Sequence, residues 1–225
     1  MEIRKVGDAY KEQGIKAILY GQSGTGKTYS IVTLPDKENT LILSAEAGLM
    51  SIKDVGKDLD VVVINGMDDL RGAFSFLNSD TKYTTVVLDS LTEIAEQVLG
   101  DEKKKCNDPR KAYGELQNIM VSLIKSFRDL KGKNVLFLCK AERTANDDGV
   151  QLYAPSMPGN KLSQAIPYLT DLVFAMRIKE GEDGSMIRAF MTQPDLQYSA
   201  KDRSGTLGQF EPPDWSVIFE KINSK

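Results

Sequence analysis

"LYGQSGTGKTYSIV" (residues 19–32) lies between an apolar run and a helical pattern, and it contains the spacing G-x-x-x-x-G-K-[ST] from Gly21 to Thr28. Backbone N–H groups of such a loop converge on phosphate oxygens, and the helix that follows adds the positive end of its dipole. We predict a nucleotide-binding P-loop in which Lys27 reaches the β- and γ-phosphates of ATP and Thr28 binds Mg²⁺. Its residues are Gly21, Gln22, Ser23, Gly24, Thr25, Gly26, Lys27 and Thr28.

The composition indicates one globular domain without histidine chemistry. The chain has 225 residues, 41% hydrophobic and 27% charged, and a formal net charge of −3 that leaves room for a local basic site. It has no histidine, which excludes Ser-His triads and His metal sites, and its two cysteines are too few for a disulfide framework. We expect an N-terminal extension at residues 1–14, a core at 15–205 and a tail at 206–225.

The same sequence indicates where the protein acts. No apolar run reaches the roughly 18 residues of a membrane span. Residues 1–14 are also too charged for a secretory signal. We therefore expect a cytoplasmic protein that does not associate with membranes.

Apolar, β-branched runs alternate with helical patterns along the chain, which is typical of an α/β fold with a mainly parallel central sheet flanked by helices. Each predicted strand is apolar enough to be buried on both faces. The strands are expected at residues 15–20, 40–46, 60–64, 84–90 and 134–142. A helix should follow Ala112, a C-terminal β-hairpin should surround the turn at 180–185, and a short helix should be capped near Asp214.

A second ligand for the metal is expected in "TVVLDS" (residues 85–90). Asp89 follows three apolar residues there, and a carboxylate at the end of a neighbouring strand suits Mg²⁺, which it would hold through the water shell of the ion. Asp89 could also cap the helical pattern that follows, and the two roles are compatible. We predict that Thr28 and Asp89 hold the metal.

Hydrolysis also needs a group that orients or deprotonates the attacking water. The residue after Asp89 is Ser90, which is not acidic, so the base must come from another position. Glu46 ends the run "LILSAE" (41–46), at the edge where a parallel sheet also places the P-loop. We predict that Glu46 is the catalytic base. Glu93, one turn into the next helix, is an alternative base, and a solvated loop carboxylate is the non-catalytic interpretation of Glu46.

Glu46 in "SAEAGL", Asp89 in "VVLDS" and the segment "MPGNKLSQAIPYLTDLVFAMRI" (157–178) follow the P-loop in an order and spacing that resembles the ATPase core of RecA-like recombinases. The resemblance covers roughly residues 15–205 and is closest to the compact, core-only phage RecA-like ATPases that are grouped with single-strand annealing proteins. It implies a RecA-like P-loop core, Glu46 as base and Asp89 as metal ligand. It also implies the host cytoplasm, a ring or filament with ATP between subunits, single-stranded DNA as partner, and a single-stranded DNA-binding protein as a further candidate partner.

In that family two loops bind DNA, and their counterparts here are residues 100–114 and 142–161. The first carries a lysine run and a neighbouring aromatic ring, which suit phosphate contact and base stacking, although such a run is also common in a merely solvated loop. The second loop is expected to be either irregular or a small hairpin. The DNA-binding candidates are Lys103, Lys104, Lys105, Arg110, Lys111, Tyr113, Arg143 and Lys161, with Tyr153 as a further aromatic ring.

The resemblance has one departure and adds one pair of residues. RecA-like proteins often end the strand before the second loop with a glutamine that senses the γ-phosphate, whereas this chain has Lys140. "SAKDRSGTL" (199–207) resembles the Lys-x-Arg-x-Gly segment of RecA-like hexameric helicases. This match implies that Lys201 and Arg203 reach the γ-phosphate of a neighbouring subunit, as an arginine finger does. Surface charge at a turn is the alternative.

Three classes of function remain open. The first is an ATPase that single-stranded DNA stimulates, acting in recombination, annealing or repair. The second is a P-loop nucleotide or small-molecule kinase, although the sequence has no compact arginine cluster of the kind that forms a kinase lid. The third is an ATP-gated loader or adaptor that binds a protein and no DNA.

Overall fold

Mainly parallel strands form the centre of the molecule. The computed structural model describes residues 3, 5, 7, 13–46, 48–106, 108–145, 148–181 and 183–224. The strand order is β10-β8-β7-β1-β5-β4-β2-β3. The strands from β7 to β3 are parallel to one another, and β8 runs antiparallel to both of its neighbours, β7 and β10. The strands are β1 (Lys16–Gly21), β2 (Thr40–Ser44), β3 (Asp60–Val63), β4 (Thr85–Asp89), β5 (Asn134–Ala145), β6 (Gln151–Pro155), β7 (Leu172–Glu180), β8 (Met186–Met191), β9 (Lys201–Asp202) and β10 (Phe210–Glu211). The predicted α/β fold class is confirmed.

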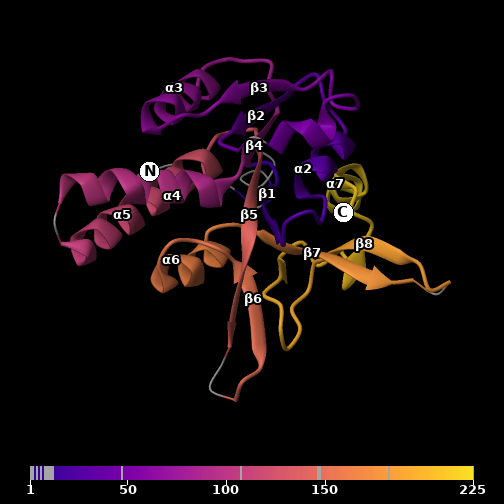
Figure 1. The fold of residues 1–225 in the computed structure, drawn as a ribbon. Helices are drawn as coiled ribbons and strands as arrows, with labels where there is room; N and C mark the ends of the chain where they lie inside the picture. Colours follow the sequence, from indigo (N-terminus) through magenta and orange to yellow (C-terminus); the bar gives the residue numbers. More distant parts are fainter. Residues whose placement is uncertain are drawn as a thin grey trace.

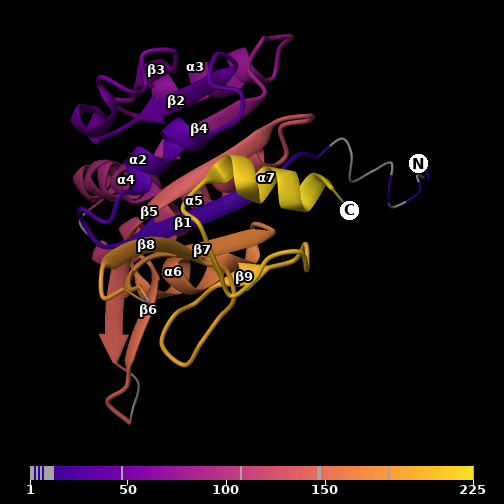
Figure 2. The same ribbon diagram turned by 90° about the vertical axis from the view of Figure 1, so that its right-hand side faces the viewer.

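Helices cover both faces of this sheet. Figure 1 shows α3, α4, α5 and α6 on one side and α2 and α7 on the other, and Figure 2 shows α7 lying across the strands. The helices are α2 (Lys27–Ser30), α3 (Met67–Leu77), α4 (Leu91–Lys105), α5 (Pro109–Arg128), α6 (Asn160–Ala165) and α7 (Trp215–Asn223), with 3₁₀ turns η1 (Ile31–Thr33), η2 (Gly48–Ile52) and η3 (Ile166–Tyr168). None of these helices combines the length and the apolar character that crossing a membrane requires.

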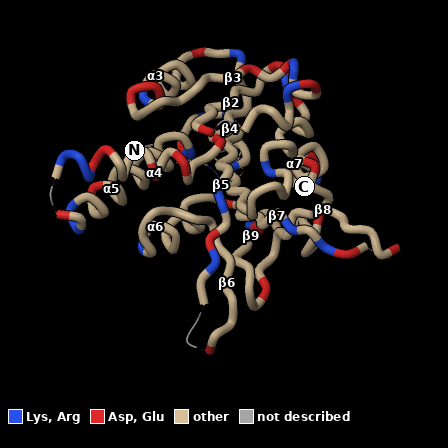
Figure 3. The backbone as a smooth tube through the Cα atoms, in the orientation of Figure 1, with Lys and Arg blue, Asp and Glu red and all other residues tan. Residues whose placement is uncertain are grey.

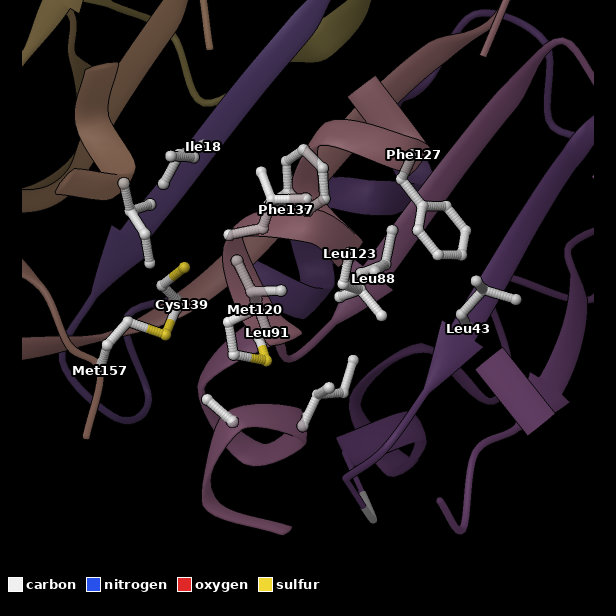
Figure 4. Close-up of a cluster of buried hydrophobic side chains, with 14 of the residues drawn as sticks. Ile18, Leu43, Leu88, Leu91, Met120, Leu123, Phe127, Phe137, Cys139 and Met157 are labelled. Carbon is white, nitrogen blue, oxygen red and sulfur yellow. The ribbon is translucent and has the colours of Figure 1, made fainter. Parts of the chain in front are cut away.

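Alternate residues of each central strand enter two separate cores. In β1, Ile18 and Tyr20 pack with the layer of α3 to α6, whereas Ala17 and Leu19 pack with the layer that contains Trp215 of α7. Figure 4 shows the first core, in which Phe137 of β5 lies among side chains of α4 and α5. This two-sided burial explains why the central strands read as continuous apolar runs.

Strand β3 departs from the prediction of burial on both faces. Its three valines, Val61, Val62 and Val63, are exposed, because β3 ends the order of the described strands and has β2 as its one neighbour among them. The apolar run of β3 therefore does not distinguish this edge strand from a central strand.

The predicted loop at residues 100–114 is wrong, because most of it is helical. Helix α4 continues to Lys105 and α5 begins at Pro109, earlier than the predicted start after Ala112. Asp108 caps α5 by accepting a hydrogen bond from the N–H of Arg110, and Pro109 follows in the first turn. Lysines in the last turn of α4 suit the negative end of its dipole.

Two hairpins and the tail follow the predictions more closely. The second loop contains an antiparallel hairpin of β5 and β6, and the C-terminal hairpin pairs β7 with β8. In Figure 1 the β5–β6 hairpin projects away from the helices. Asp214 caps α7 as expected, and β10 adds the tail to the sheet. Of the predicted N-terminal extension, all but residues 3, 5, 7, 13 and 14 lie outside the described residues.

Candidate functional site

The loop between β1 and α2 has the backbone geometry that a phosphate-binding loop requires. Gly24 and Gly26 have φ angles of 74° and 99°, in the left-handed region that favours glycine. Thr25 Oγ1 donates to the carbonyl of Gln22 at 2.8 Å and closes the turn. Lys27 Nζ donates to the carbonyls of Gly21 at 2.9 Å and Gln22 at 3.0 Å, which holds the ammonium group at the start of the loop.

Thr28 and Asp89 meet at the carboxyl edge of the sheet. Strand β5 lies between β1 and β4, and the P-loop and Asp89 both lie at the carboxyl ends of these parallel strands. Thr28 Oγ1 donates to Asp89 Oδ2 at 2.8 Å. Asp89 is only 3% exposed. Burial raises the pKa of Asp89 to about 6; the hydrogen bond from Thr28 opposes this rise, and the Glu46 carboxylate adds to it.

This pair fits a magnesium ion. A hydroxyl and a carboxylate are oxygen ligands of the kind that Mg²⁺ prefers. A Cβ atom on Gly48 would lie 3.6 Å from Thr28 Oγ1 and 4.0 Å from Asp89 Oδ2, so glycine keeps space open beside the pair. Among the described residues no group of three or more acidic or cysteine side chains is arranged so that it could hold a metal ion. Phosphate oxygens and water would therefore complete the coordination of a metal held here.

Glu46 lies beside the same pair, in the turn that follows β2. Ser44 Oγ donates to the Glu46 carbonyl at 2.9 Å, and the N–H of Ala45 donates to the Asp89 carbonyl at 2.8 Å, so this turn is tied to the end of β4. The hydroxyl of Ser90 donates to Glu46 Oε1. Burial lowers the pKa of Lys27, whereas the nearby charges of Asp89 and Glu46 raise it.

The alternative base, Glu93, is already paired. Lys140 Nζ lies 2.9 Å from Glu93 Oε2 and 3.1 Å from Glu96 Oε2. Lys140 is level with Gly21 in the sheet, so the residue that replaces the expected glutamine does lie at the P-loop edge. Its ammonium group is bonded to two carboxylates of α4.

Lys201 and Arg203 lie at the opposite, amino edge. Strand β9 pairs with the first residues of β7, whereas the P-loop follows the last residue of β1. Lys201 Nζ donates to the carbonyls of Pro167 and Thr170. Arg203 forms an exposed ion pair with Asp171 at 3.0 Å. Within one chain both cations are therefore remote from the P-loop, and action in trans stays a prediction.

The first group of DNA-binding candidates surrounds the tips of α4 and α5, where basic and acidic segments alternate (Figure 3). Lys104 pairs with Asp101 at 3.0 Å, and Lys105 pairs with Glu102 at 2.6 Å. Lys103 Nζ lies 5.5 Å from the ring centroid of Tyr113. Arg110 and Lys111 are exposed in the first turn of α5.

The second group is spread over the β5–β6 hairpin and α6. Arg143 Nε donates to Gln151 Oε1 at 2.6 Å, across the hairpin. Lys161 is exposed in α6. The ring of Tyr153 stacks on the ring of Tyr198, with 4.4 Å between the ring centroids, so this face of Tyr153 is not available to stack on a nucleotide base. DNA binding by either group stays a prediction.

Sequence reasoning missed Arg188 of β8, which lies against the P-loop. Its Nε donates to the Thr25 carbonyl at 3.0 Å. A Cβ atom on Gly21 would also lie 3.0 Å from Cβ of Met176, so β7 packs closely on the first P-loop residue. No motif marks these two residues, and only the pairing of β1 with β7 and of β7 with β8 brings them to the site.

A comparison with known protein families agrees with this geometry. The model of an AAA domain family matches residues 13–204, which include the P-loop, Glu46, Asp89 and the Lys201–Arg203 segment. No curated protein matches the chain. Because the family match covers most of its length, the chain belongs to this AAA domain family of P-loop ATPases.

Proposed function

We propose that the protein is a RecA-like ATPase that single-stranded DNA stimulates and that acts in phage-type recombination, annealing or repair. The observation that carries the hydrolytic part is the position of Glu46. Its carboxylate accepts a hydrogen bond from Ser90, next to the Thr28–Asp89 pair and near Lys27. A base, a metal site and a phosphate-binding lysine therefore occupy one edge of the sheet.

Each side chain has a role in this proposal. Lys27 and the loop N–H groups bind the phosphates of ATP, and Thr28 and Asp89 hold Mg²⁺. Mg²⁺, when bound, supplies positive charge that stabilises the charge developing on the phosphates. Glu46 orients the attacking water and takes its proton on a carboxylate oxygen, while the Ser90 hydroxyl fixes the orientation of that carboxylate.

The DNA part of the proposal rests on the elements that leave this edge. Strand β5 continues from Lys140, level with the P-loop, into the β5–β6 hairpin. Helix α4 begins directly after Ser90 and carries Lys103–Lys105 in its last turn. Strand β5 and helix α4 therefore both connect the phosphate-binding edge directly to a candidate DNA-binding segment.

The proposal includes assembly with ATP between subunits. Lys201 and Arg203 lie on the opposite edge of the sheet from the P-loop, so a ring or filament would bring them to the P-loop of a neighbour. A single-stranded DNA-binding protein is a further proposed partner, because both proteins would share one DNA substrate.

The test is steady-state ATP hydrolysis by the wild type and Glu46→Gln, with and without single-stranded DNA, at low and moderate salt. The proposal predicts stimulation that falls with salt and is lost in the variant. Hydrolysis that is indifferent to DNA would contradict the DNA part and favour the loader or adaptor. Transfer of the phosphoryl group to an added nucleotide or small molecule would instead identify a kinase.

A further inference from the structure

Arg188 is a cation at the P-loop that the proposed function does not use. Strand β7 runs parallel to β1 with Ala175 opposite Tyr20, so its last residues extend past the end of β1. Strand β8 returns beside them with Arg188 opposite Ile178. The β7–β8 hairpin, visible in Figure 1, thus brings an arginine from a distant part of the sequence to the nucleotide loop.

The contact of Arg188 with the loop is specific. Its Nε donates to the carbonyl of Thr25 at 3.0 Å. Its Cδ lies 3.3 Å from the position that a Cβ atom of Gly26 would occupy, so only glycine lets the arginine approach without a shift. The guanidinium group therefore lies on the Thr25–Gly26 turn, next to the backbone N–H groups that lead into α2.

The remaining donors of Arg188 are available for a ligand. Arginine carries five N–H donors in a rigid fork, so a bond at Nε leaves the two terminal nitrogens. Among the described residues, no carboxylate lies within ion-pair distance of Arg188, and the terminal nitrogens bond no acceptor. Two other arginines differ, since Arg177 lies 3.6 Å from the ring centroid of Tyr198 and Arg203 pairs with Asp171.

We infer that Arg188 binds the phosphates of the nucleotide within its own subunit, through its terminal nitrogens, while its Nε holds Thr25. This inference rests on the proposed function, because it requires a nucleotide in the P-loop. The P-loop backbone cradles the α- and β-phosphates, whereas the lysine reaches the β- and γ-phosphates. Since Arg188 lies against the backbone turn, it contacts the part that ATP and ADP share.

A contact with this shared part stabilises the bound substrate and the transition state equally, so its loss raises KM and leaves kcat unchanged. Arg188→Ala is expected to weaken the binding of both Mg-ATP and Mg-ADP by about tenfold or more, as for the loss of a charge-assisted hydrogen bond. Arg188→Lys keeps the charge but lacks the planar fork of donors. It cannot hold Thr25 and bind a phosphate bidentately at the same time, so its loss of affinity should be intermediate.

Isothermal titration calorimetry of the full chain with each nucleotide measures these affinities. Lys179→Ala is the matched control, because Lys179 is a cation of the same hairpin whose Nζ lies 4.3 Å from the ring centroid of Phe210; its affinities should be unchanged. The affinity of the wild type for ADP should fall more steeply with salt than that of Arg188→Ala. Thermal unfolding without nucleotide shows that the variants are folded.

Each contrary result identifies what fails. Wild-type affinities for both nucleotides in Arg188→Ala would overturn the inference and leave the proposed function intact. A loss of affinity confined to ATP would overturn the assignment to the shared phosphates. Equal salt dependence in wild type and variant would overturn a charge contact, because removal of a cation that contacts a phosphate must weaken the dependence on salt. If the wild type binds neither nucleotide, the proposed function fails as well.

Discussion

Both edges of the sheet carry lysine side chains, but the groups that surround these lysines differ. At the carboxyl edge, Lys27 donates to carbonyls of a glycine loop, and the charges of Asp89 and Glu46 raise its pKa against the effect of burial. At the amino edge, Lys16 and Lys201 donate to backbone carbonyls of the same chain. Burial lowers the pKa of Lys16 to about 8. Cations alone therefore do not make a phosphate site; a loop with converging N–H groups is also needed.

The proposed function gives the two edges different tasks. In that proposal the carboxyl edge binds the nucleotide, whereas Lys201 and Arg203 at the amino edge reach a phosphate only if a second subunit presents one. Variants at each edge test this division, beginning with Arg203, whose loss should have the greatest consequence.

Loss of Arg203 should have the largest effect if the edges meet between subunits. Arg203→Ala is expected to lower kcat by about 10³-fold or more, as for an arginine finger. Mixing it with inactive Lys27→Ala should restore part of the activity, because some interfaces then pair an intact P-loop with an intact Arg203.

The same mixture can refute the division. If co-assembly is demonstrated and no activity returns, the amino edge does not act in trans. Arg203→Ala should keep its melting temperature, because the exposed pair with Asp171 contributes only about 0–1 kcal/mol.

Within the carboxyl edge, Glu46 should matter far more than Glu93. Glu46→Gln is expected to lower kcat by about 10²–10⁴-fold with ATP binding retained, as for loss of a general base. Glu93→Gln is the matched control and should have a much smaller effect, because Lys140 already neutralises this carboxylate. Normal turnover in Glu46→Gln would place the base elsewhere.

Burial at the carboxyl edge should be evident in the pH dependence of stability. The pKa of Asp89, about 6, lies above its ordinary value of 3.8, so the folded state favours the protonated form. Asp89 therefore stabilises the fold below pH 3.8, and this contribution is lost as the pH rises through 6.

Asp89→Asn is uncharged at every pH, so its free energy of unfolding should lack this dependence on pH. Without Mg²⁺ or nucleotide, it should exceed the wild type in free energy of unfolding above pH 6 by up to about 3 kcal/mol. This gain should vanish near pH 4. Denaturant unfolding across this pH range measures it, with exposed Asp58→Asn as control. A variant less stable than the wild type at pH 8 would contradict this account of Asp89.

The smallest effect is expected at the tip of α4, because its lysines are exposed and partly paired. The triple variant Lys103→Ala/Lys104→Ala/Lys105→Ala should bind single-stranded DNA more weakly, with a salt slope reduced by about 0.7 for each phosphate that these lysines neutralise in the wild type. Lys53→Ala/Lys57→Ala, at exposed lysines elsewhere, should not change the slope. An unchanged slope in the triple variant would remove the tip of α4 from the DNA site.

The sequence predicted the carboxyl edge well because spacing there determines geometry. Gly21 to Thr28 specify a loop, and parallel strands ending at Asp89 and near Glu46 must meet at that edge. The lysine run does not distinguish a loop from the end of a helix, because its charges suit both. The valines of β3 do not distinguish an edge strand from a central strand, because the sequence does not show which strands lie beside it. Arg188 could not be predicted, since only strand pairing over a long sequence separation brings it to Thr25.

Equilibrium binding of Mg-ATP to the wild type and to Lys27→Ala tests most directly whether Gly21–Thr28 is the nucleotide site. Lys27 is the only P-loop side chain with a positive charge, and its ammonium group is held at the start of the loop. We predict tight binding by the wild type and its loss in the folded variant. Micromolar affinity retained in Lys27→Ala would contradict the assignment of Gly21–Thr28 as the nucleotide site.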